Sequence, residues 1–428
     1  MTGDDRKAGV GPTRVTVSGP EWVSLLDLGL DRLVHGSQVA SPDQLPELVA
    51  GAAGDFGCED TLIYLADVQQ RVLVPFLSPV GHEHDTYAEP LGIDSTVAGR
   101  AFQQTRQLSQ SAPAGQAGER TRVWLPLLAG AERLGVLGVT VSTQAVDDSE
   151  GMRRLERFTS IVAALVMTKT LYGDSIVRTR RTNPMTLAAE LQWSLLPPLT
   201  FISPSITIAG GLEPAYEVAG DSLDYAVDAG TARFAVFDGM GHGLVSAQLI
   251  SLVVAAYRNA RRLGQSLTQT AGHIESAVTE VFRDDSFATG LVCELDTTSG
   301  RLTWISAGHL EPLLLRGGRF VRTLHVEPML PLGLNQALAQ GITAAVGSED
   351  LEPGDLVLIY TDGVTEARSP DGEFFGQDRL VDLVLRNLAA GLATPETMRR
   401  VVHALLEHQA GHLDDDATLL IIEWHGPQ

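Results

Sequence analysis

The pattern of hydrophobic and polar positions divides the chain into three regions, of which the first mixes strand-like and helix-like stretches. TLIYLAD at 61–67 is rich in β-formers. RVWLPLLAGAERLGVLGVTVS at 122–142 contains two apolar runs separated by a glycine-containing turn, which predicts a β-hairpin. Between them, 93–107 has the character of a short helix. We therefore expect a small α+β domain over 21–150, preceded by a disordered N-terminus over 1–20.

The second region, 151–200, has a helical period. Apolar residues recur there at steps of three and four, at Met152, Leu155, Phe158, Ile161, Val162 and Leu165. In a second helical segment, Leu187, Leu191 and Leu195 are spaced by four, and Pro197 and Pro198 end the helix. One interpretation is that both helices pack on their own domains. The other, which we favour, is a helical linker that pairs with a second chain to form a homodimer.

The third region, 201–428, is rich in strands. Its six candidate strands are ARFAVFD, GLVCELD, RLTWISAG, EPLLLRGG, DLVLIYTDG and ATLLIIEW. Several are continuous apolar runs, which is expected when both faces of a sheet are covered. Short turns between them favour antiparallel sheets with helices packed outside, and the chain lacks the strict strand–helix alternation of a doubly wound fold. The whole chain is therefore predicted to be an α+β protein of two domains.

Composition and charge narrow the class of protein. The 428-residue chain has a formal net charge of −22, which argues against binding nucleic acid or an anionic membrane through its overall field. Its two cysteines, Cys58 and Cys293, offer neither a disulfide framework nor a zinc-binding spacing. We find no signal peptide and no apolar run long enough to span a bilayer. These features predict a cytoplasmic protein that binds neither membranes nor nucleic acid.

Four aspartates lie at or near the ends of predicted strands. Asp221 lies in AGDSLD, Asp238 in FAVFDGMGHG, Asp362 in LIYTDG, and Asp415 in DDDAT. A carboxylate at the end of a buried strand is costly unless a positive charge pairs with it, and no Lys or Arg lies within four residues of Asp238 or Asp415. A divalent cation is the simplest partner, and ligation by oxygen alone favours Mg²⁺ or Mn²⁺ over zinc. The alternative is that these acid–glycine pairs mark ordinary turns.

These blocks resemble, in order along the chain, those of the SpoIIE/RsbU-type branch of the PPM (PP2C-like) serine/threonine phosphatases. The resembling segments are ELQWSLLP, VAGDSLDY, FDGMGHGLVSA, SFATGLVCELDTTSGRLTWISAGHLEPLLL, YTDGVTEARSPDGEFFG and DDDATLLII. The sequence departs from the family pattern at Ala219 and Ser222, neither of which removes a carboxylate. The resemblance implies an α-β-β-α sandwich over 201–428 with two Mn²⁺ or Mg²⁺ ions at one end.

The resemblance also implies roles for individual residues. Asp238 would bridge the two metals, with the carbonyl of Gly239 on one of them. Asp362 and Asp415 would hold the other metal, and Asp221 would support the site, so that Asp221 and Asp238 together serve catalysis. The two ions would activate a water that attacks phosphorus.

Three further residues near these motifs have two interpretations each. Asp416 either orients Asp415 or binds metal itself. His242 either has a structural role in its turn or protonates the leaving oxygen. His309 in SAGH is expected to be a hydrogen-bonded hairpin residue.

The first domain resembles a GAF domain, a common sensory module, through PLGIDSTVAGRAFQQTRQLSQS and VWLPLLAGAERLGVLGVTVS. A GAF fold has a pocket on one face of its sheet. Cys58 is expected to be an ordinary buried cysteine rather than a point of cofactor attachment.

Two functions remain open at the level of sequence. The first is a phosphoserine/threonine phosphatase, gated by the GAF-like domain, whose substrate is a phosphorylated STAS-domain anti-sigma-factor antagonist. The second is a pseudophosphatase that binds partners without turnover. Retention of all four aspartates favours the enzyme.

Overall fold

The chain folds into two units whose boundary falls between Arg180 and Arg181. The structure, a computed structural model, describes residues 21–79, 88–111, 120–213, 216, 220–282, 286–335, 344–411 and 415–427. The expected disordered segment 1–20 and the departure at Ala219 lie outside these residues. Among the described residues, no helix combines the length and the apolar character needed to cross a bilayer.

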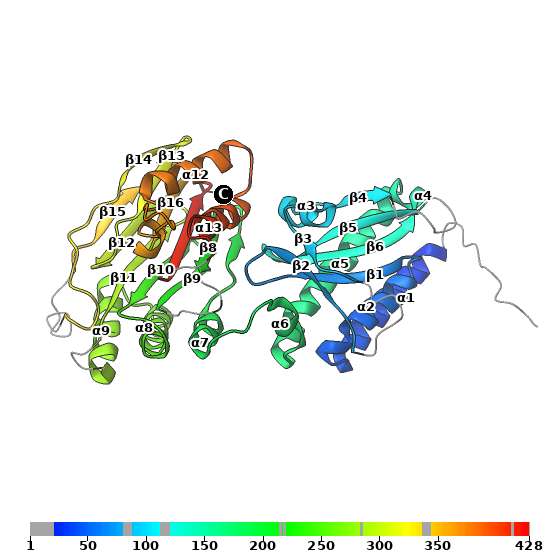
Figure 1. The fold of residues 1–428 in the computed structure, drawn as a ribbon, viewed down its shortest axis with the longest axis horizontal. Helices are drawn as coiled ribbons and strands as arrows, with labels where there is room; N and C mark the ends of the chain where they lie inside the picture. The colour runs from blue at the N-terminus through cyan, green and yellow to red at the C-terminus, as the bar shows by residue number, and fades with distance from the viewer. Residues whose placement is uncertain are drawn as a thin grey trace, which may run out of the picture. The chain divides into compact units, whose positions relative to one another are not determined.

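The N-terminal unit is built on one antiparallel sheet of six strands in the order β3-β2-β1-β6-β5-β4 (Figure 1). The strands are β1 Glu59–Ala66, β2 Val72–Phe76, β3 Leu91–Gly92, β4 Leu108–Ser111, β5 Arg120–Ala129 and β6 Glu132–Ser142. The helices are α1 Glu21–Val39, α2 Leu45–Gly54, α3 Val97–Gln104, α4 Thr143–Val146, α5 Ser149–Lys169 and α6 Ser175–Arg180. The predicted hairpin at 122–142 is present as β5 and β6, which are neighbours in the sheet.

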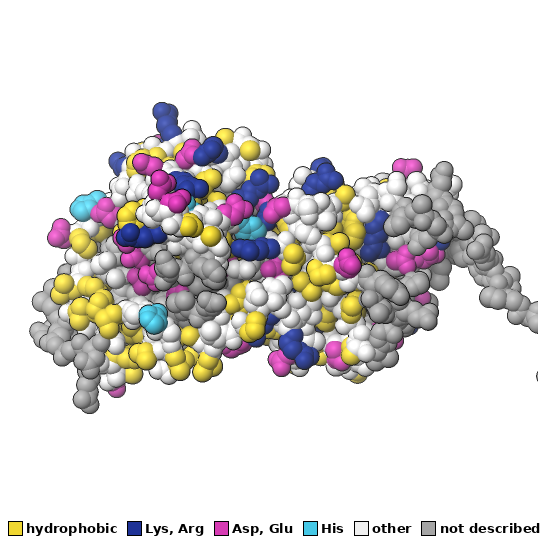
Figure 2. All heavy atoms as spheres, in the orientation of Figure 1, with side chains coloured by type: hydrophobic (Ala, Val, Ile, Leu, Met, Phe, Trp, Pro, Cys, Tyr) yellow, Lys and Arg dark blue, Asp and Glu magenta, His cyan; other side chains and the backbone are white. Residues whose placement is uncertain are grey.

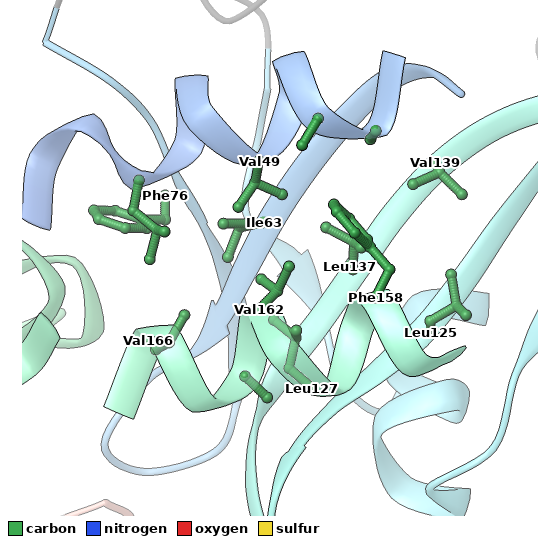
Figure 3. Close-up of a cluster of buried hydrophobic side chains, with 14 of the residues drawn as sticks. Val49, Ile63, Phe76, Leu125, Leu127, Leu137, Val139, Phe158, Val162 and Val166 are labelled. Atoms are coloured by element: carbon green, nitrogen blue, oxygen red, sulfur yellow. The ribbon is translucent and has the colours of Figure 1, made fainter. Parts of the chain in front are cut away.

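Two hydrophobic clusters cover the two faces of this sheet. On one face, side chains of α2 and α5, including Val49, Phe158 and Val162, pack against Ile63 and Leu137 of the sheet (Figure 3). On the other face, Ala98 and Phe102 of α3 pack against strand residues such as Tyr64 and Trp124. The cluster on the α5 face contains Cys58, which is buried and free, and burial raises the pKa of its thiol to about 12.

The helix α5 differs from the expected linker. Its apolar stripe packs on the sheet of its own unit: Leu155, Phe158 and Val162 are buried there, and Met152, Ile161 and Leu165 lie half-buried against the same cluster. The segment 151–200 is therefore not one separate connector, because α5 and α6 belong to the N-terminal unit. The periodicity correctly predicted the helix but did not show which surface its apolar face would meet.

The C-terminal unit is a sandwich of two antiparallel sheets. One has the order β15-β12-β11-β10-β9 and the other β14-β13-β16-β17-β8-β7. The strands are β7 Thr200–Ile202, β8 Ile206–Glu213, β9 Asp221–Asp228, β10 Thr231–Gly239, β11 Ala288–Asp296, β12 Arg301–Ala307, β13 Leu313–Arg316, β14 Arg319–Thr323, β15 Gly347–Asp350, β16 Asp355–Tyr360 and β17 Ala417–Trp424. The helices are α7 Leu187–Leu195, α8 Leu244–Arg262, α9 Leu267–Phe282, α11 Asp362–Thr365, α12 Gln377–Ala389 and α13 Thr394–His408.

The core lies in three layers, which explains the continuous apolar strands. Between the sheets, Phe234 and Trp304 of one sheet pack with Val357 and Ile422 of the other. The outer face of the five-stranded sheet is covered by α8 and α9, and that of the six-stranded sheet by α12 and α13 (Figure 1). All six residues of β16 are buried because both of its faces are covered. The C-terminal unit therefore has the predicted α-β-β-α arrangement.

The helix α7 packs on α8 with a different face from the one predicted. Its buried residues are Ala188, Ala189 and Gln192, whereas Leu187 remains 65% exposed. Leu191 is half-buried and packs with Ala188 of its own helix and Ala247 of α8. The leucine spacing thus predicted the helix correctly. Two of the residues that are buried, however, are Ala188 and Gln192, each one position after a leucine of the predicted face.

Candidate metal centre

Two of the predicted acids lie side by side on neighbouring strands. Asp221 is the first residue of β9, and Asp238 is the last but one of β10; the antiparallel register pairs them directly. The same register pairs Asp238 with Thr289 on β11. Because directly opposed residues of an antiparallel sheet project from the same face, Asp221, Asp238 and Thr289 form one row across three strands.

The other sheet brings its acids to the same place through Thr361 and Asp416. Thr361, which follows β16, donates a hydrogen bond from its hydroxyl to Asp221 Oδ2 at 2.7 Å, and its Oγ1 accepts one from the N–H of Thr418 at 2.9 Å. The Oδ2 atom of Asp416 accepts hydrogen bonds from the N–H groups of Gly220 and Asp221, the latter at 3.1 Å. These bonds join the two sheets at this end of the sandwich. Asp362 and Asp415 lie at the same end, because each is adjacent in the chain to one of the bonded residues, Thr361 and Asp416.

The electrostatics of these carboxyl groups show that they crowd one another. Burial, followed by the charges of Asp362, Asp415 and Asp416, raises the pKa of Asp238 to about 7, against the effect of a hydrogen bond from Thr289. Burial, followed by the charges of Asp238 and Asp416, holds the pKa of Asp221 well above its ordinary value. A cluster of this kind is stable in its charged form only with a compensating cation.

The pKa values of the last two acids point the same way. Burial raises the pKa of Asp416 to about 6, against the effect of its two main-chain hydrogen bonds. Burial also raises the pKa of Asp415, and the charge of Asp362 adds to that rise. His242 acts in the opposite direction on both groups, which places this exposed histidine near Asp415 and Asp416. Figure 2 shows a group of acidic side chains on the visible face of the C-terminal unit, at the left of the picture.

The residues present fit a hard divalent cation. The Oδ1 atom of Asp416 is buried and has no hydrogen-bond partner among the described residues, although its Oδ2 has two. A buried carboxylate oxygen without a donor is costly unless a ligand completes it. In the part of the chain that the structure describes, no three His, Cys, Asp or Glu side chains are close enough to enclose an ion. Carboxylate and carbonyl oxygens together with water are the ligands that suit Mg²⁺ and Mn²⁺.

The glycines of the motifs are required by close approach of the backbone. A Cβ on Gly239 would lie 2.8 Å from Ser246 Oγ and 3.1 Å from the carbonyl oxygen of Gly220. The Gly239 carbonyl accepts a hydrogen bond from Ser246 at 3.0 Å and retains a second lone pair. A Cβ on Gly363 would lie 1.9 Å from the Asp416 carbonyl oxygen. A larger residue at Gly239 would displace α8 or the segment before β9, and one at Gly363 would displace the main chain at Asp416.

The second acid of AGDSLD, Asp224, lies outside the site. It is 1% exposed and pairs with Arg258 at 2.9 Å and with Arg261 at 3.1 Å, both on α8. The three-residue step from Asp221 to Asp224 along a strand places their side chains on opposite faces. Asp224 therefore has a structural role, whereas Asp221 faces the acid cluster.

The structure thus brings together every acid predicted from the sequence, and it adds residues that motif reasoning missed. Thr361, Thr289 and Ser246 each hydrogen-bond a site residue or its main chain. Thr361 directly precedes Asp362, and Thr289 lies in the SFATG segment, so both residues belong to the motifs described from the sequence. Nothing in their spacing showed that their hydroxyls turn toward the acids, because that depends on strand register.

A helix-flanked β-sandwich with converging acids at one end defines the class of fold: the C-terminal unit is PP2C-like. Residues 228–425 match the profile of the family described as "Stage II sporulation protein E (SpoIIE)".

Particular relatives are similar over the same region. The phosphoserine phosphatase RsbU of Bacillus subtilis is 24% identical over 236 residues, which cover 55% of this chain and 68% of RsbU. Protein IcfG of Synechocystis sp. is 31% identical over 137 residues, which cover 32% of this chain and 20% of IcfG. The solved RsbU and RsbW domains of Rv1364c from Mycobacterium tuberculosis share 28% identity at a TM-score of 0.44, over 53% of this chain and 63% of that one. The chain thus spans only a fifth of the length of IcfG.

Proposed function

We propose that this protein is a phosphoprotein phosphatase that uses two Mn²⁺ or Mg²⁺ ions to hydrolyse phosphoserine or phosphothreonine. The observation that supports this most is the convergence of Asp221, Asp238 and Asp416 from two sheets, with raised pKa values and one buried, unpartnered carboxylate oxygen. A structural turn would not gather like charges in this way, because each carboxylate raises the cost of ionising the next.

In this proposal each residue has a distinct task. Asp238 would be a ligand of both ions, the Gly239 carbonyl would contribute to one of them, and Asp362 and Asp415 would hold the other. Asp221 supports the site through its hydrogen bond with Thr361, and Asp416 offers its free oxygen. When bound, the ions supply the positive charge that clamps the phosphoryl group and lowers the pKa of the attacking water.

The leaving serine oxygen needs a proton as the phosphorus–oxygen bond breaks. His242 is exposed and lies near Asp415 and Asp416, so it is the side chain that we assign as a candidate donor. Its alternative role is structural: it lies between Gly241 and Gly243, whose positive φ values of 81° and 79° shape the turn before α8.

The substrate and regulation proposed for this chain rest on its resemblance to the RsbU-type phosphatases. The substrate is a phosphorylated STAS-domain protein of a partner-switching pathway in the cytoplasm. The N-terminal unit, with its six-stranded sheet covered by helices on both faces, is proposed to be a GAF-like sensor that regulates the phosphatase. Neither membrane nor nucleic acid is a partner in this proposal.

The test is phosphate release by the full chain from a phosphoserine STAS-domain protein at increasing Mn²⁺. We expect turnover that a chelator stops and that added Mn²⁺ restores. The second candidate function, a pseudophosphatase, would instead bind the phosphoprotein and Mn²⁺ without releasing phosphate. A pulldown with Asp238→Asn, which should retain the phosphorylated substrate, identifies the partner in either case.

A further inference from the structure

Two residues outside the proposed metal set are connected to Asp238 by hydrogen bonds. Thr289 lies directly opposite Asp238 in the β10–β11 register, and its hydrogen bond lowers the pKa of that carboxyl group. The hydroxyl of Thr289 also lies 3.0 Å from Nδ1 of His309. Thr289 is therefore shared between a candidate metal ligand and a histidine ring.

His309 is held firmly in this position. The residue is 8% exposed, and its main-chain carbonyl accepts a hydrogen bond from the hydroxyl of Ser306 at 3.1 Å. Gly308, with φ of 67°, bends the chain after β12, and its bridge to Gly290 carries the histidine back over the start of β11. The SAGH segment thus places one ring against Thr289 rather than leaving it in a solvated hairpin.

The ring of His309 is neutral at ordinary pH, since burial lowers its pKa to about 4. A neutral imidazole has one nitrogen that donates and one that accepts. A longer-range hydrogen-bonding interaction with the main-chain carbonyl of Tyr360 acts against the effect of burial on this pKa. Its Nε2 atom, however, makes no hydrogen bond of acceptable geometry with any described residue. The well-formed polar contact of the ring is therefore the one that Nδ1 makes with Thr289.

The direction of the two hydrogen bonds follows from the chemistry of a metal ligand. An ionised Asp238 can only accept, so the hydroxyl of Thr289 must donate its proton to the carboxylate. The oxygen of Thr289 then has only lone pairs to offer His309, so Nδ1 must carry the ring proton. This orientation leaves Nε2 without a proton that would need an acceptor.

We propose that Thr289 and His309 are a positioning pair for Asp238: the Nδ1–H of His309 holds the Thr289 hydroxyl with its proton directed at the Asp238 carboxylate. The pair fixes the orientation of the bridging ligand before the ions arrive. It acts through Asp238 and touches neither ion nor substrate. This inference rests on the proposed metal site and assigns to the SAGH histidine a part in it.

The chain offers matched variants for both members of the pair. Thr289→Val removes the hydroxyl at nearly constant shape, and Thr289→Ser keeps it. His309→Asn retains an amide nitrogen near the place of Nδ1, whereas His309→Gln places its amide near Nε2. A role through Nδ1 therefore predicts that Asn substitutes for histidine and Gln does not. A role in packing alone would make the longer Gln at least as good as Asn.

The first experiment measures Mn²⁺ binding to the full chain by calorimetry and, in parallel, the Mn²⁺ requirement of phosphate release. Partners that orient metal ligands typically contribute about 10- to 100-fold to affinity. We expect losses of that size for Thr289→Val and His309→Gln, and less than about 3-fold for Thr289→Ser and His309→Asn. The kcat at saturating Mn²⁺ should fall less than the apparent affinity.

The second experiment reads the tautomer without any turnover. Nitrogen-15 NMR of histidine-labelled protein saturated with Mg²⁺ should show His309 protonated at Nδ1. His309→Asn, whose amide occupies the Nδ1 position, serves to identify the signal.

Three results would overturn the inference: protonation of His309 at Nε2 in the Mg²⁺-saturated protein, wild-type Mn²⁺ affinity in folded Thr289→Val, or equal affinities for the Asn and Gln variants. Failure of the proposed function is recognised separately. If Asp238→Ala binds Mn²⁺ like the wild type, the metal site itself has been misplaced and the positioning pair is refuted with it.

Discussion

At the scale of single residues, two aspartates three positions apart on β9 have opposite electrostatic surroundings. Asp221 faces other carboxyl groups, and its pKa is held high by burial and by those neighbours. Asp224 faces Arg258 and Arg261 and is paired with both. Removing the carboxylate of Asp221 should therefore relieve repulsion among the acids. Removing that of Asp224 should leave the positive charges of Arg258 and Arg261 without their partner.

The first prediction concerns the bridging ligand. Asp238→Ala should abolish metal-dependent phosphatase activity and weaken Mn²⁺ binding, because two cations would then lack their shared anion. Its fold in chelator should be at least as stable as that of the wild type, since a carboxyl crowded by three others is removed. Activity and calorimetry report the first effect, and thermal melting in chelator reports the second. Activity within tenfold of wild type would remove Asp238 from the site.

The matched control is Asp224→Ala, on the neighbouring strand. Removing one partner of a buried ion pair typically costs about 3–5 kcal/mol, and partial exposure of the two arginines places this case toward the low end. We expect Asp224→Ala to melt at a clearly lower temperature while its Mn²⁺ affinity, measured below that temperature, stays near wild type. Asp238→Ala should thus weaken Mn²⁺ binding without lowering the melting temperature. Asp224→Ala should lower the melting temperature without weakening Mn²⁺ binding.

The second prediction concerns pH without metal. The pKa of Asp238 is raised from 3.8 to about 7 by folding, so between these values the folded state binds more protons than the unfolded state. Stability in chelator should then fall as pH rises from about 4 to about 7, by an amount on the order of a few kcal/mol. Urea unfolding of wild type and Asp238→Asn across this range is the measurement. The slope should be shallower in Asp238→Asn, and equal slopes would contradict the assignment.

At the scale of elements, α7 is the segment that connects the start of the C-terminal unit to the acid cluster. Gln192 donates a hydrogen bond to the main-chain carbonyl of Asp221 at 2.6 Å. Arg258 of α8 donates to the carbonyl of Leu195 at the end of α7 and also pairs with Asp224 of β9. A shift of α7 would therefore disturb both the first residue of β9 and the ion pair that anchors this strand.

The third prediction follows from this connection. Leu191→Glu should loosen α7 from Ala247 of α8 and raise the apparent Mn²⁺ requirement, by about 5- to 150-fold if the coupling is about 1–3 kcal/mol. Leu187→Glu is the matched control, because that leucine lies one turn away on the same helix and is 65% exposed. A manganese titration should separate the two variants. If their curves overlay that of the wild type, α7 is only a tether.

The same titration applied to the domain beginning near Asn183 extends this prediction to the N-terminal unit. We expect the truncated domain to need more Mn²⁺ and to turn over slowly, because the four acids repel one another unless the surrounding turns are braced. Circular dichroism establishes first that the truncated domain is folded. Activity equal to that of the full chain would show that the N-terminal unit regulates the site in some other way.

Elements were predicted with uneven success, and the reason differs from case to case. The hairpin of β5 and β6 and the buried strands β16 and β17 were correctly predicted, because composition and local turns determine such segments. The helix α5 was correctly predicted as a helix but assigned to a linker, since amphipathic periodicity does not identify the surface that it meets. The face of α7 was misplaced because small residues, not leucines, make its closest approach to α8.

At the scale of the whole molecule, the fourth prediction concerns assembly. The homodimer was predicted from the apolar stripe of α5, but most of that stripe packs against the sheet of its own unit. Apolar side chains remain exposed in the last turn of α5 and just after it: Met167 by 38%, Leu171 by 79% and Tyr172 by 73%. If the proposed dimer forms, it should use this end of α5. Light scattering should show a dimer that Leu171→Asp with Tyr172→Asp converts to a monomer, and a wild-type monomer at tens of micromolar would refute the proposal.

The sequence by itself predicted an acid site and named its candidate members, Asp221, Asp238, Asp362 and Asp415. Carboxylates at the ends of apolar strands beside glycine need a cation, and that requirement depends only on residue type and local order. It also predicted a strand-rich C-terminal region whose motifs stand in the order of the matching family profile, because strand composition and motif order depend on local sequence and not on packing.

Tertiary structure alone decided which side chains face one another. The registers of β9, β10 and β11 set Asp221, Asp238 and Thr289 in one row, and Gly308 turns His309 back onto that row. Thr361 reaches Asp221 across 140 positions of chain because two sheets meet there. Contacts of this kind depend on register and on sheet packing, which the core as a whole fixes and no local pattern encodes.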